Sequence, residues 1–477
     1  MLFLIIYLRI LMNSTTEKIF VCGAGIAGMF SAYYLKKSNP NLDIVLIDKS
    51  DSVGGLLKSF QYENYGIFDV GIHTLYQTGI DQIDEVVLGV LEQEEWSELP
   101  GDIGGTYVNG ILQTGSPYID LRNIETNEKP IWLGELLEAA VVENDESDNA
   151  LEYLVNHFGN SLATKVMAPI LEKVFKTKAS ELNTMAVKLL PMNRIVAFDD
   201  LPMQDLMLSS KIRSRVAIPN QRNLKEEYKS NKKGFYPKKL GLGFYVKAFM
   251  DDFLKMGGHI WTNSQIAKIN ISSNEICSLN VIKNNEEFTV ENVKGLCWGA
   301  GLPVLSWVLD PGFTKELNFD PPLKNAIVNV VTSKNVDRFK DLQYVYVLDG
   351  GYSIFRVAIY KNYCPNMDNE LNKISLEILY LKDEEEGLED KILQEMINIG
   401  IVDCKNDLSF FQLEKLTAGV PRPTQKNISS IRDIRNNISA KKINNLICVG
   451  SLAEDNLYFQ SDILKDALKK LKHFANI

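Results

Sequence analysis

The feature that most constrains this chain is a glycine-rich turn set between a strand pattern and a helix pattern. The apolar run Lys18–Cys22 leads directly into the sequence GAGIAG, and a helix pattern follows over residues 26–37. A second apolar run over 42–47 ends in Asp48, twenty residues after the third glycine. Near-continuous apolar strands joined through a helix are typical of a βαβ unit in a parallel sheet.

The GAGIAG turn has the spacing GxGxxG, which suits a dinucleotide. Gly23 permits the tight turn, Gly25 lets the backbone approach a diphosphate, and Gly28 lets the helix pack closely on the strand. The diphosphate then lies at the helix N-terminus, where free N–H groups favour an anion. A carboxylate at Asp48 can accept hydrogen bonds from ribose hydroxyls. The residues we expect to bind the dinucleotide here are Gly23, Ala24, Gly25, Ile26, Ala27, Gly28, Asp48 and Lys49.

Two further motifs follow Asp48. The first is Asp51-Ser52-Val53-Gly54-Gly55-Leu56, and the second is the D-x-G-x-H pattern from Asp69 to His73. With the glycine turn, these motifs resemble the amine-oxidase and protoporphyrinogen-oxidase-like flavoprotein superfamily, which includes the UDP-galactopyranose mutases. The resemblance implies FAD as the cofactor, with the glycine pair beside its diphosphate and ribityl chain and the D-x-G-x-H segment near its isoalloxazine ring. No cysteine stands where covalent attachment would occur, so we expect the FAD to be non-covalent.

Later segments match the same superfamily in order. A helix pattern after Gly241-Leu242-Gly243 leads to Gly257-Gly258 and a strand containing Ile266, and Leu446–Gly450 resembles the flavin-binding strand near the C-terminus. The further residues that the resemblance assigns to FAD are Gly54, Gly55, Leu56, Gly71, Ile266, Gly450, Gln460 and Ser461. Ser451 and Gln460 depart from the mutases, which tend to have an arginine and an acidic residue there.

Three side chains are candidates for the chemistry. His73 is the catalytic candidate, because the resemblance places it near the flavin and histidine titrates in a useful range; a structural histidine bonded to the backbone is the alternative. Arg194 and Arg356 are candidates for binding an anionic group of the substrate. For each arginine, a salt bridge to a protein carboxylate remains an equally open explanation.

The patterns predict a mixed α/β chain in which a Rossmann-like FAD-binding domain, a parallel sheet with helices, is interleaved with a mixed α+β substrate region. We expect the FAD-binding domain to comprise 13–80, 236–302 and 440–477, and the substrate region to comprise 81–235 and 303–439. Within these, 325–380 alternates apolar and polar residues as an antiparallel sheet does. The lysine-rich segment 221–239 is typical of a solvated loop, and the acidic run 383–386 of the start of a helix.

Composition excludes several classes of protein. A formal net charge of −10 makes nucleic acid an unfavourable partner. The six cysteines form no CxxC pair and the four histidines are scattered, so we expect no metal site and no disulfide, and a cytoplasmic location. Residues 1–12 are an apolar tail too short to span a bilayer, or a mis-assigned start with translation beginning at Met12. A membrane contact is therefore doubtful, and no pattern indicates an oligomeric state.

These features together predict an FAD-dependent oxidoreductase of the amine-oxidase-like superfamily. We expect a small-molecule substrate, either a sugar or a nucleotide sugar. One alternative is a ring isomerase like the UDP-galactopyranose mutases, in which reduced flavin attacks the sugar and no net oxidation occurs. The other alternative is a flavoprotein without catalytic activity.

Overall fold

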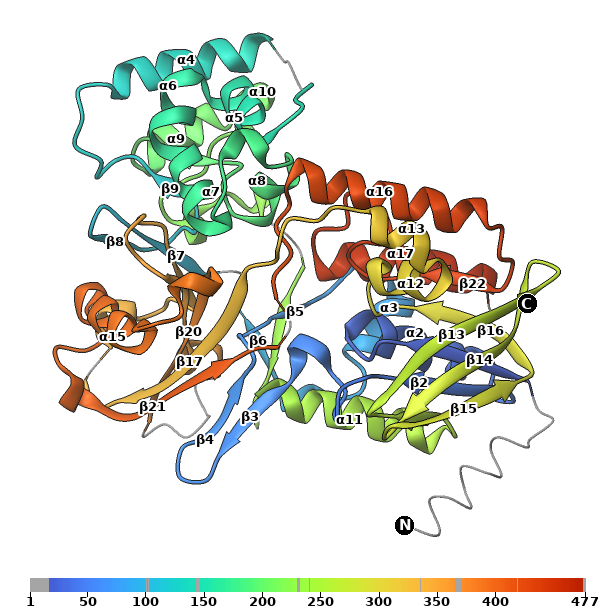
Figure 1. Ribbon diagram of the computed structural model, residues 1–477. Coiled ribbons are helices and arrows are strands. Elements are labelled where there is room, and N and C mark those ends of the chain that lie inside the picture. Colours follow the sequence, from blue (N-terminus) through green and yellow to red (C-terminus); the bar gives the residue numbers. More distant parts are fainter. Residues whose placement is uncertain are drawn as a thin grey trace.

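A parallel sheet forms the centre of one unit of the molecule (Figure 1). The computed structural model describes residues 17–99, 101, 103–142, 146–229, 232–239, 241–334, 336–364, 371–417 and 419–474, so the expected tail 1–12 lies outside the described residues. The sheet has the order β12-β2-β1-β16-β22, with every pair parallel. Its strands are β1 (Lys18–Cys22), β2 (Asp43–Ile47), β12 (His259–Trp261), β16 (Val293–Trp298) and β22 (Leu446–Cys448).

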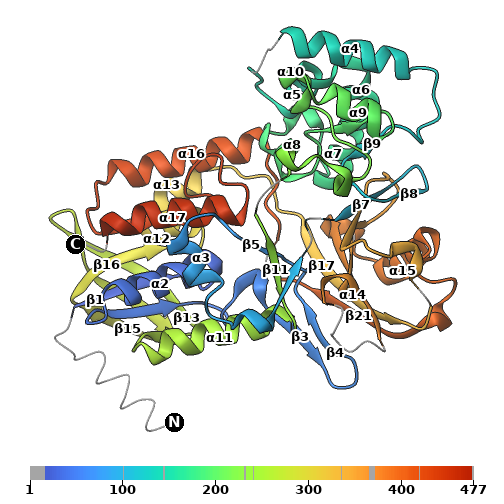
Figure 2. The ribbon, with the colours of Figure 1, turned by 180° about the vertical axis from the view of Figure 1, so that it is seen from behind.

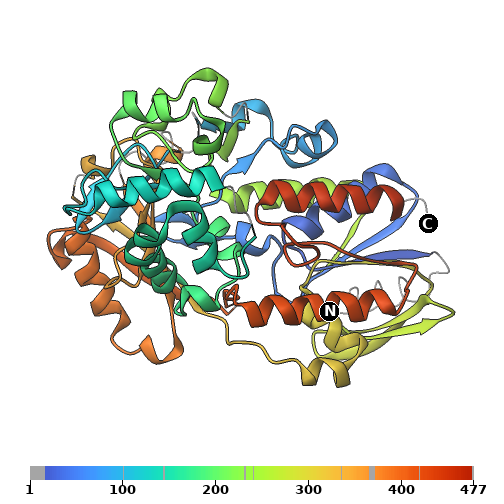
Figure 3. The same ribbon diagram turned by 90° about the horizontal axis from the view of Figure 1, so that it is seen from above.

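Alternating side chains of the central strand β1 enter two different cores. Ile19 and Val21 pack with helices α2 (Ile26–Ser38), α11 (Gly241–Lys255) and α17 (Gln460–Phe474). Phe20 and Cys22 point to the opposite face, because successive strand residues alternate. That face is covered by an antiparallel sheet and by helices, which are β13 (Ser264–Ser272), β14 (Glu275–Lys283), β15 (Glu286–Glu291), α12 (Leu302–Leu309) and α16 (Gln425–Ala440). Figure 3 shows α16 and α17, both red, on either side of the parallel sheet.

A second, seven-stranded sheet lies beside the parallel-sheet unit (Figures 1 and 2). Its order is β21-β17-β20-β19-β18-β7-β8, antiparallel except between β18 and β7. Its strands are β7 (Gly104–Val108), β8 (Ile111–Gln113), β17 (Lys324–Thr332), β18 (Tyr344–Val347), β19 (Ile354–Ile359), β20 (Asn372–Tyr380) and β21 (Leu408–Lys415). Helix α15 (Leu388–Ile399) packs its apolar side chains on one face. The opposite face contributes Val331 and Ala358 to the core of the parallel-sheet unit.

A helical unit with its own core completes the molecule (top of Figure 1). Its helices include α4 (Lys129–Val142), α5 (Ala150–Phe158), α7 (Ala168–Phe175), α8 (Met185–Leu189), α9 (Asp200–Leu206) and α10 (Ser210–Arg213). Lys173 on α7 joins this unit to the seven-stranded sheet by donating hydrogen bonds to the carbonyls of Val347 (2.5 Å) and Ile354 (2.8 Å). Burial lowers the pKa of Lys173 to about 7.

The fold confirms the expected mixed α/β class with a Rossmann-like unit, and it corrects three local expectations. Part of 221–239 is not a loop, because β11 (Gly234–Pro237) pairs between β5 (Leu75–Tyr76) and β6 (Trp96–Leu99). The acidic run 383–386 precedes helix α15, which begins only at Leu388 after a short 3-10 turn. Helices α12 and α16 lie almost wholly within 303–439, expected in the substrate region, but their apolar side chains belong to the core on one face of the parallel sheet.

The tight contact at Gly28 predicts a sharp effect on stability. A Cβ atom at Gly28 would lie 1.7 Å from the carbonyl oxygen of Gly23. We expect Gly28→Ala to lower the free energy of unfolding by about 3 kcal/mol or more, because helix and turn must separate. Gly134→Ala on α4, where a Cβ meets nothing within 4 Å, is the matched control and should be neutral or stabilising. Denaturant titrations would contradict the prediction if both variants were as stable as the wild type.

Candidate functional site

The carboxyl ends of four parallel strands meet at one edge of the central sheet, and each is followed within two residues by a glycine or an acid. Strand β1 leads to Gly23, β2 to Asp48, β16 to Gly299 and β22 to Gly450. These turns pack tightly: a Cβ atom on Gly23 would lie 2.8 Å from the backbone nitrogen of Ala300. In open parallel sheets this edge is where ligands bind.

The N-terminus of α2 opens onto this edge, and no side chain of the described residues caps it. Gly25 is the N-cap residue, and a Cβ atom there would meet nothing within 4 Å. The first N–H groups of a helix have no partner inside the helix, so they remain available to an anion. The Asp48 carboxylate lies at the same turn, where it accepts hydrogen bonds from the backbone N–H groups of Ala24 (2.7 Å) and Ser50 (2.8 Å).

The glycine pair predicted from sequence lies against the glycine turn. The N–H of Gly54 donates to the carbonyl of Ala24 at 2.8 Å. Both glycines have positive φ, +112° at Gly54 and +58° at Gly55, which favours glycine. A Cβ atom on Gly55 would lie 3.0 Å from Cα of Gly25, so the two motifs form one surface. The next side chain, Leu56, is 57% exposed.

The other residues assigned to FAD occupy different positions around this edge. Lys49 is exposed in the loop after Asp48. Ile266 is buried in β13, where it pairs with Val281. Two residues before Ile266, the N–H of Ser264 donates to the carbonyl of Asp48 at 2.9 Å. Gln460 and Ser461 begin α17, directly after Phe459, which is 59% exposed.

His73 is held in one orientation by its own chain segment. Its Nδ1 lies 2.7 Å from the carbonyl oxygen of Gly71. A carbonyl can only accept, so Nδ1 carries the proton and the neutral ring leaves Nε2 as an acceptor. Burial and the nearby Arg356 guanidinium lower the pKa of His73, which favours this neutral form.

Arg356 forms an ion pair with Glu377, a residue that the sequence interpretation did not single out. The two residues lie opposite each other on β19 and β20. Nε of Arg356 donates to Oε1 of Glu377 at 2.7 Å, Nη2 donates to the same oxygen, and Nη2 also lies 3.4 Å from the carbonyl of Ile72. Burial acts to lower the pKa of Arg356, but the charge and hydrogen bond of Glu377, together with Tyr346 and Tyr363, outweigh it, and the pKa lies above its usual range.

The structure therefore brings Gly71, His73 and Arg356 together with Glu377. A Cβ atom on Gly71 would lie 3.1 Å from Oε1 of Glu377 and 3.6 Å from Cε1 of His73. The signal in the sequence for Glu377 was a single acid within the apolar strand KISLEILY. Its pairing with Arg356 depends on strand register, which that signal does not give.

Arg194 lies elsewhere, in the helical unit. It precedes β10 (Ile195–Val196), and its guanidinium carbon is 5.8 Å from the ring centre of Tyr118. Its Nε is buried and has no hydrogen-bond partner in the part of the chain that the structure describes. Among the described residues it makes no hydrogen bond or ion pair with the cluster around His73.

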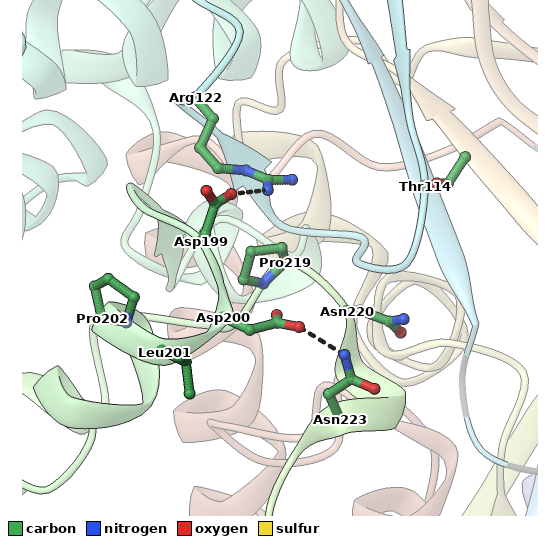
Figure 4. Close-up of a pocket in the computed structure, with 9 residues that line it drawn as sticks. All are labelled: Thr114, Arg122, Asp199, Asp200, Leu201, Pro202, Pro219, Asn220 and Asn223. Atoms are coloured by element: carbon green, nitrogen blue, oxygen red, sulfur yellow. Dashed lines mark hydrogen bonds and ion pairs between the residues drawn. The ribbon is translucent and has the colours of Figure 1, made fainter.

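The helical unit also has a pocket of about 640 Å³ at the other end of β10 (Figure 4). In it Arg122 bridges Asp120 and Asp199, and Asn223 donates to Asp200 at 2.6 Å. The lining residues are Thr114, Arg122, Asp199, Asp200, Leu201, Pro202, Pro219, Asn220 and Asn223. None of them was a predicted site residue.

The described residues contain neither a metal-binding cluster nor a membrane-spanning helix. No group of three or more His, Cys, Asp or Glu side chains there is placed to hold a metal ion. No helix in the described part of the chain has the length and apolar character needed to cross a bilayer.

Comparison with known proteins gives a matching family model and a distant relative. Residues 21–87 match the family described as NAD(P)-binding Rossmann-like domain. The chain is 22% identical over 268 residues to coproporphyrinogen III oxidase of Staphylococcus aureus (strain NCTC 8325 / PS 47). That match covers 53% of this chain and 55% of the relative, so it spans about half of each protein.

Solved structures that share the fold over nearly the whole chain include the following three. Reduced UDP-galactopyranose mutase superposes with a TM-score of 0.72 at 15% identity, covering 97% of this chain and 94% of that one. A protein assigned as protoporphyrinogen oxidase from Exiguobacterium sp. 255-15 gives 0.67 at 15% identity, covering 97% and 100%. Putrescine oxidase bound to putrescine gives 0.59 at 11% identity, covering 97% and 99%. The likeness is one of fold, and it confirms the resemblance to amine-oxidase-like proteins and to UDP-galactopyranose mutase.

The ion pair predicts a coupled effect on stability. The side chains of Arg356 and Glu377 are only 19% and 18% exposed, so Arg356→Met leaves a mostly buried carboxylate without its partner. We expect the free energy of unfolding to fall by about 2–4 kcal/mol. Adding Glu377→Gln should recover part of that loss, because the second change removes the stranded charge. Denaturant titrations of the four proteins in the cycle measure the coupling, and strictly additive effects would contradict a direct pair.

The lowered pKa of His73 predicts how the contribution of this side chain to folding stability changes with pH. The folded protein binds a proton at this ring less readily than the unfolded chain, whose ordinary value is 6.5. The contribution of His73 to the free energy of unfolding is therefore complete above pH 6.5 and is lost as the pH falls below that value. The difference in unfolding free energy between wild type and His73→Gln should shrink from about pH 8 to about pH 5. A difference that stays constant or grows on acidification would show that the pKa is not lowered.

Proposed function

We propose that this chain is an FAD-dependent oxidoreductase of the amine-oxidase-like superfamily that acts on a sugar or a nucleotide sugar. The observation that carries the proposal is the edge of the parallel sheet, where the uncapped α2 N-terminus, Asp48 and Gly54-Gly55 form one surface. The nicotinamide alternative accounts for the glycine turn and Asp48 but not for the glycine pair. The resemblance of that pair to flavoprotein motifs favours FAD.

The residues around the edge fit a non-covalent FAD. The α2 N-terminus and Gly25 would hold the diphosphate, Asp48 the ribose, and Gly54-Gly55 the adjoining chain. The exposed side chain of Leu56 directly follows the glycine pair, and Phe459 precedes α17. Large apolar side chains exposed beside a glycine-lined surface are stabilised when a ligand covers them.

We assign the cofactor to 13–80, 236–302 and 440–477. The substrate region is 81–235 and 303–439, apart from the helices of 303–439 that pack on the parallel sheet. We also propose FAD contacts at Lys49, Ile266, Gly450, Gln460 and Ser461, and a substrate contact at Arg194.

When bound, the flavin would supply the transfer of electrons, and the protein would bind, orient and shield the reactants. His73 offers an unprotonated Nε2 that can accept a proton or a hydrogen bond. Arg356 uses Nε and Nη2 for Glu377. Among the described residues Nη1 has no hydrogen-bond partner, so it remains a donor for a phosphate or carboxylate of the substrate.

The proposal predicts a yellow protein from which denaturation releases all of the flavin as FAD. Gly25→Val should reduce flavin content at least about tenfold, because its side chain fills the space that the diphosphate needs. The fold should persist, since a Cβ at Gly25 meets no neighbour within 4 Å. Gly134→Val, at an equally open position on α4, is the control and should keep full flavin content. A wild-type protein that binds NAD tightly and no FAD would refute the proposal.

Substrate screening separates the remaining alternatives. Nucleotide sugars and amines are incubated with the oxidised and the reduced protein, and products are identified by mass spectrometry. Substrate oxidation with flavin reduction supports the oxidoreductase. Turnover by the reduced form alone, with redox-neutral products, selects the ring isomerase. Full flavin content without turnover of any compound selects a non-catalytic flavoprotein.

A further inference from the structure

Asp69, the first residue of the segment that contains His73, is fixed from several directions. Its side chain is fully buried. Its carboxylate accepts hydrogen bonds from Ser59 Oγ (2.6 Å), the N–H of Leu242 (3.0 Å) and the Tyr236 hydroxyl (2.5 Å). These donors come from β3 (Ser59–Tyr62), the first turn of α11 and β11. The carboxylate therefore ties the end of β4 (Gly66–Asp69) to two later parts of the parallel-sheet unit.

The backbone of Asp69 is held by the other sheet. Its N–H donates to the Tyr360 hydroxyl oxygen at 2.6 Å. Tyr360 directly follows β19, the strand that carries Arg356. The Tyr360 hydroxyl oxygen lies 3.2 Å from Ser375 Oγ on β20, and Ser375 donates to Asn329 Oδ1 on β17 at 2.5 Å. A row of polar groups from β17, β20 and the residue after β19 thus ends on the backbone of Asp69.

Two hydrogen bonds within the segment link the fixed backbone of Asp69 to the ring of His73. The N–H of Gly71 donates to the carbonyl of Asp69 at 2.9 Å, and the Gly71 carbonyl accepts from Nδ1 of His73 at 2.7 Å. Gly71 has a φ of +70°, so the turn requires a conformation that other residues rarely adopt. A shift of Asp69 therefore moves the carbonyl that selects the protonated nitrogen of His73.

We infer that Tyr360 and Asp69 are positioning residues that hold the Gly71 carbonyl in place and so keep the proton of His73 on Nδ1. Removing the Tyr360 hydroxyl leaves the Asp69 N–H buried without its acceptor. The segment then relaxes, and His73 exchanges between its two neutral tautomers. The orientation of His73 is a property of the chain itself, whereas its consequence for a bound flavin rests on the proposed function.

The test is Tyr360→Phe in the full-length protein, with Tyr62→Phe as the matched control. The Tyr62 hydroxyl accepts from Asn329 Nδ2 (3.2 Å) and donates to Glu414 Oε1 (3.0 Å), so the control breaks the same polar row away from Asp69. The chain has four histidines, and nitrogen-15 spectra of labelled histidine side chains report which ring nitrogen is protonated. The signals of His73 are identified by their loss in His73→Gln.

We expect Tyr360→Phe to shift the two nitrogen signals of His73 toward each other, as tautomer exchange requires, and Tyr62→Phe to leave them at their wild-type positions. Unchanged signals in a folded Tyr360→Phe protein would overturn the inference, and so would equal shifts in both variants. If Tyr360→Phe does not fold, Ser375→Ala takes its place, because it removes the neighbour of the Tyr360 hydroxyl and should produce a smaller shift in the same direction.

Flavin spectra of the same variants distinguish a failure of this inference from a failure of the proposed function. In flavin-loaded protein, Tyr360→Phe should shift the flavin absorption spectrum and Tyr62→Phe should not. A wild-type protein that binds no flavin would refute the proposed function, while the histidine signals would still decide the positioning role. If Tyr360→Phe shifts the histidine signals but leaves the flavin spectrum unchanged, then the orientation of His73 does not affect the bound flavin.

Discussion

The close contact between helix α2 and the turn after strand β1 sets the geometry on which the rest of the structure depends. Only a residue without a side chain fits at Gly28, where a Cβ atom would overlap the Gly23 carbonyl. Because the helix lies this close, its N-terminus opens at the carboxyl edge of the parallel sheet. Asp48 and the glycine pair then meet that N-terminus through backbone hydrogen bonds. Because this binding surface is made of backbone groups, its shape depends on the packing of α2 against the turn more than on the side chains that line the surface.

The second half of the candidate site depends on a polar junction between two sheets. One face of the seven-stranded sheet packs apolar side chains on α15, and the alternate residues face the parallel-sheet unit. Those residues include Arg356, Ser375 and Glu377. Buried polar groups are costly unless they are paired, so each pairing restricts how the two sheets can sit together.

The sequence was most informative where function depends on local geometry. The turn Gly23–Gly28, the carboxylate of Asp48 and strands such as Val293–Trp298 are encoded within short windows, and the structure has them where the patterns predicted. The partners of Arg356 and Asp69 were not predictable in this way. Glu377 is 21 residues from Arg356 and Tyr360 is 291 residues from Asp69, so their contacts follow from register and from the docking of two sheets.

The order of strands in the parallel sheet also bears on how the protein is made. The central strand β1 lies between β2 and β16, and the edge strand β22 comes from Leu446–Cys448, near the far end of the chain. During synthesis the first βαβ unit, β1-α2-β2, leaves the ribosome long before β12, β16 and β22, which complete the sheet. Its apolar residues must wait for partners hundreds of residues away, and such long-range pairing is slow and exposed to aggregation. The nascent chain should therefore depend on chaperones until its last strand emerges.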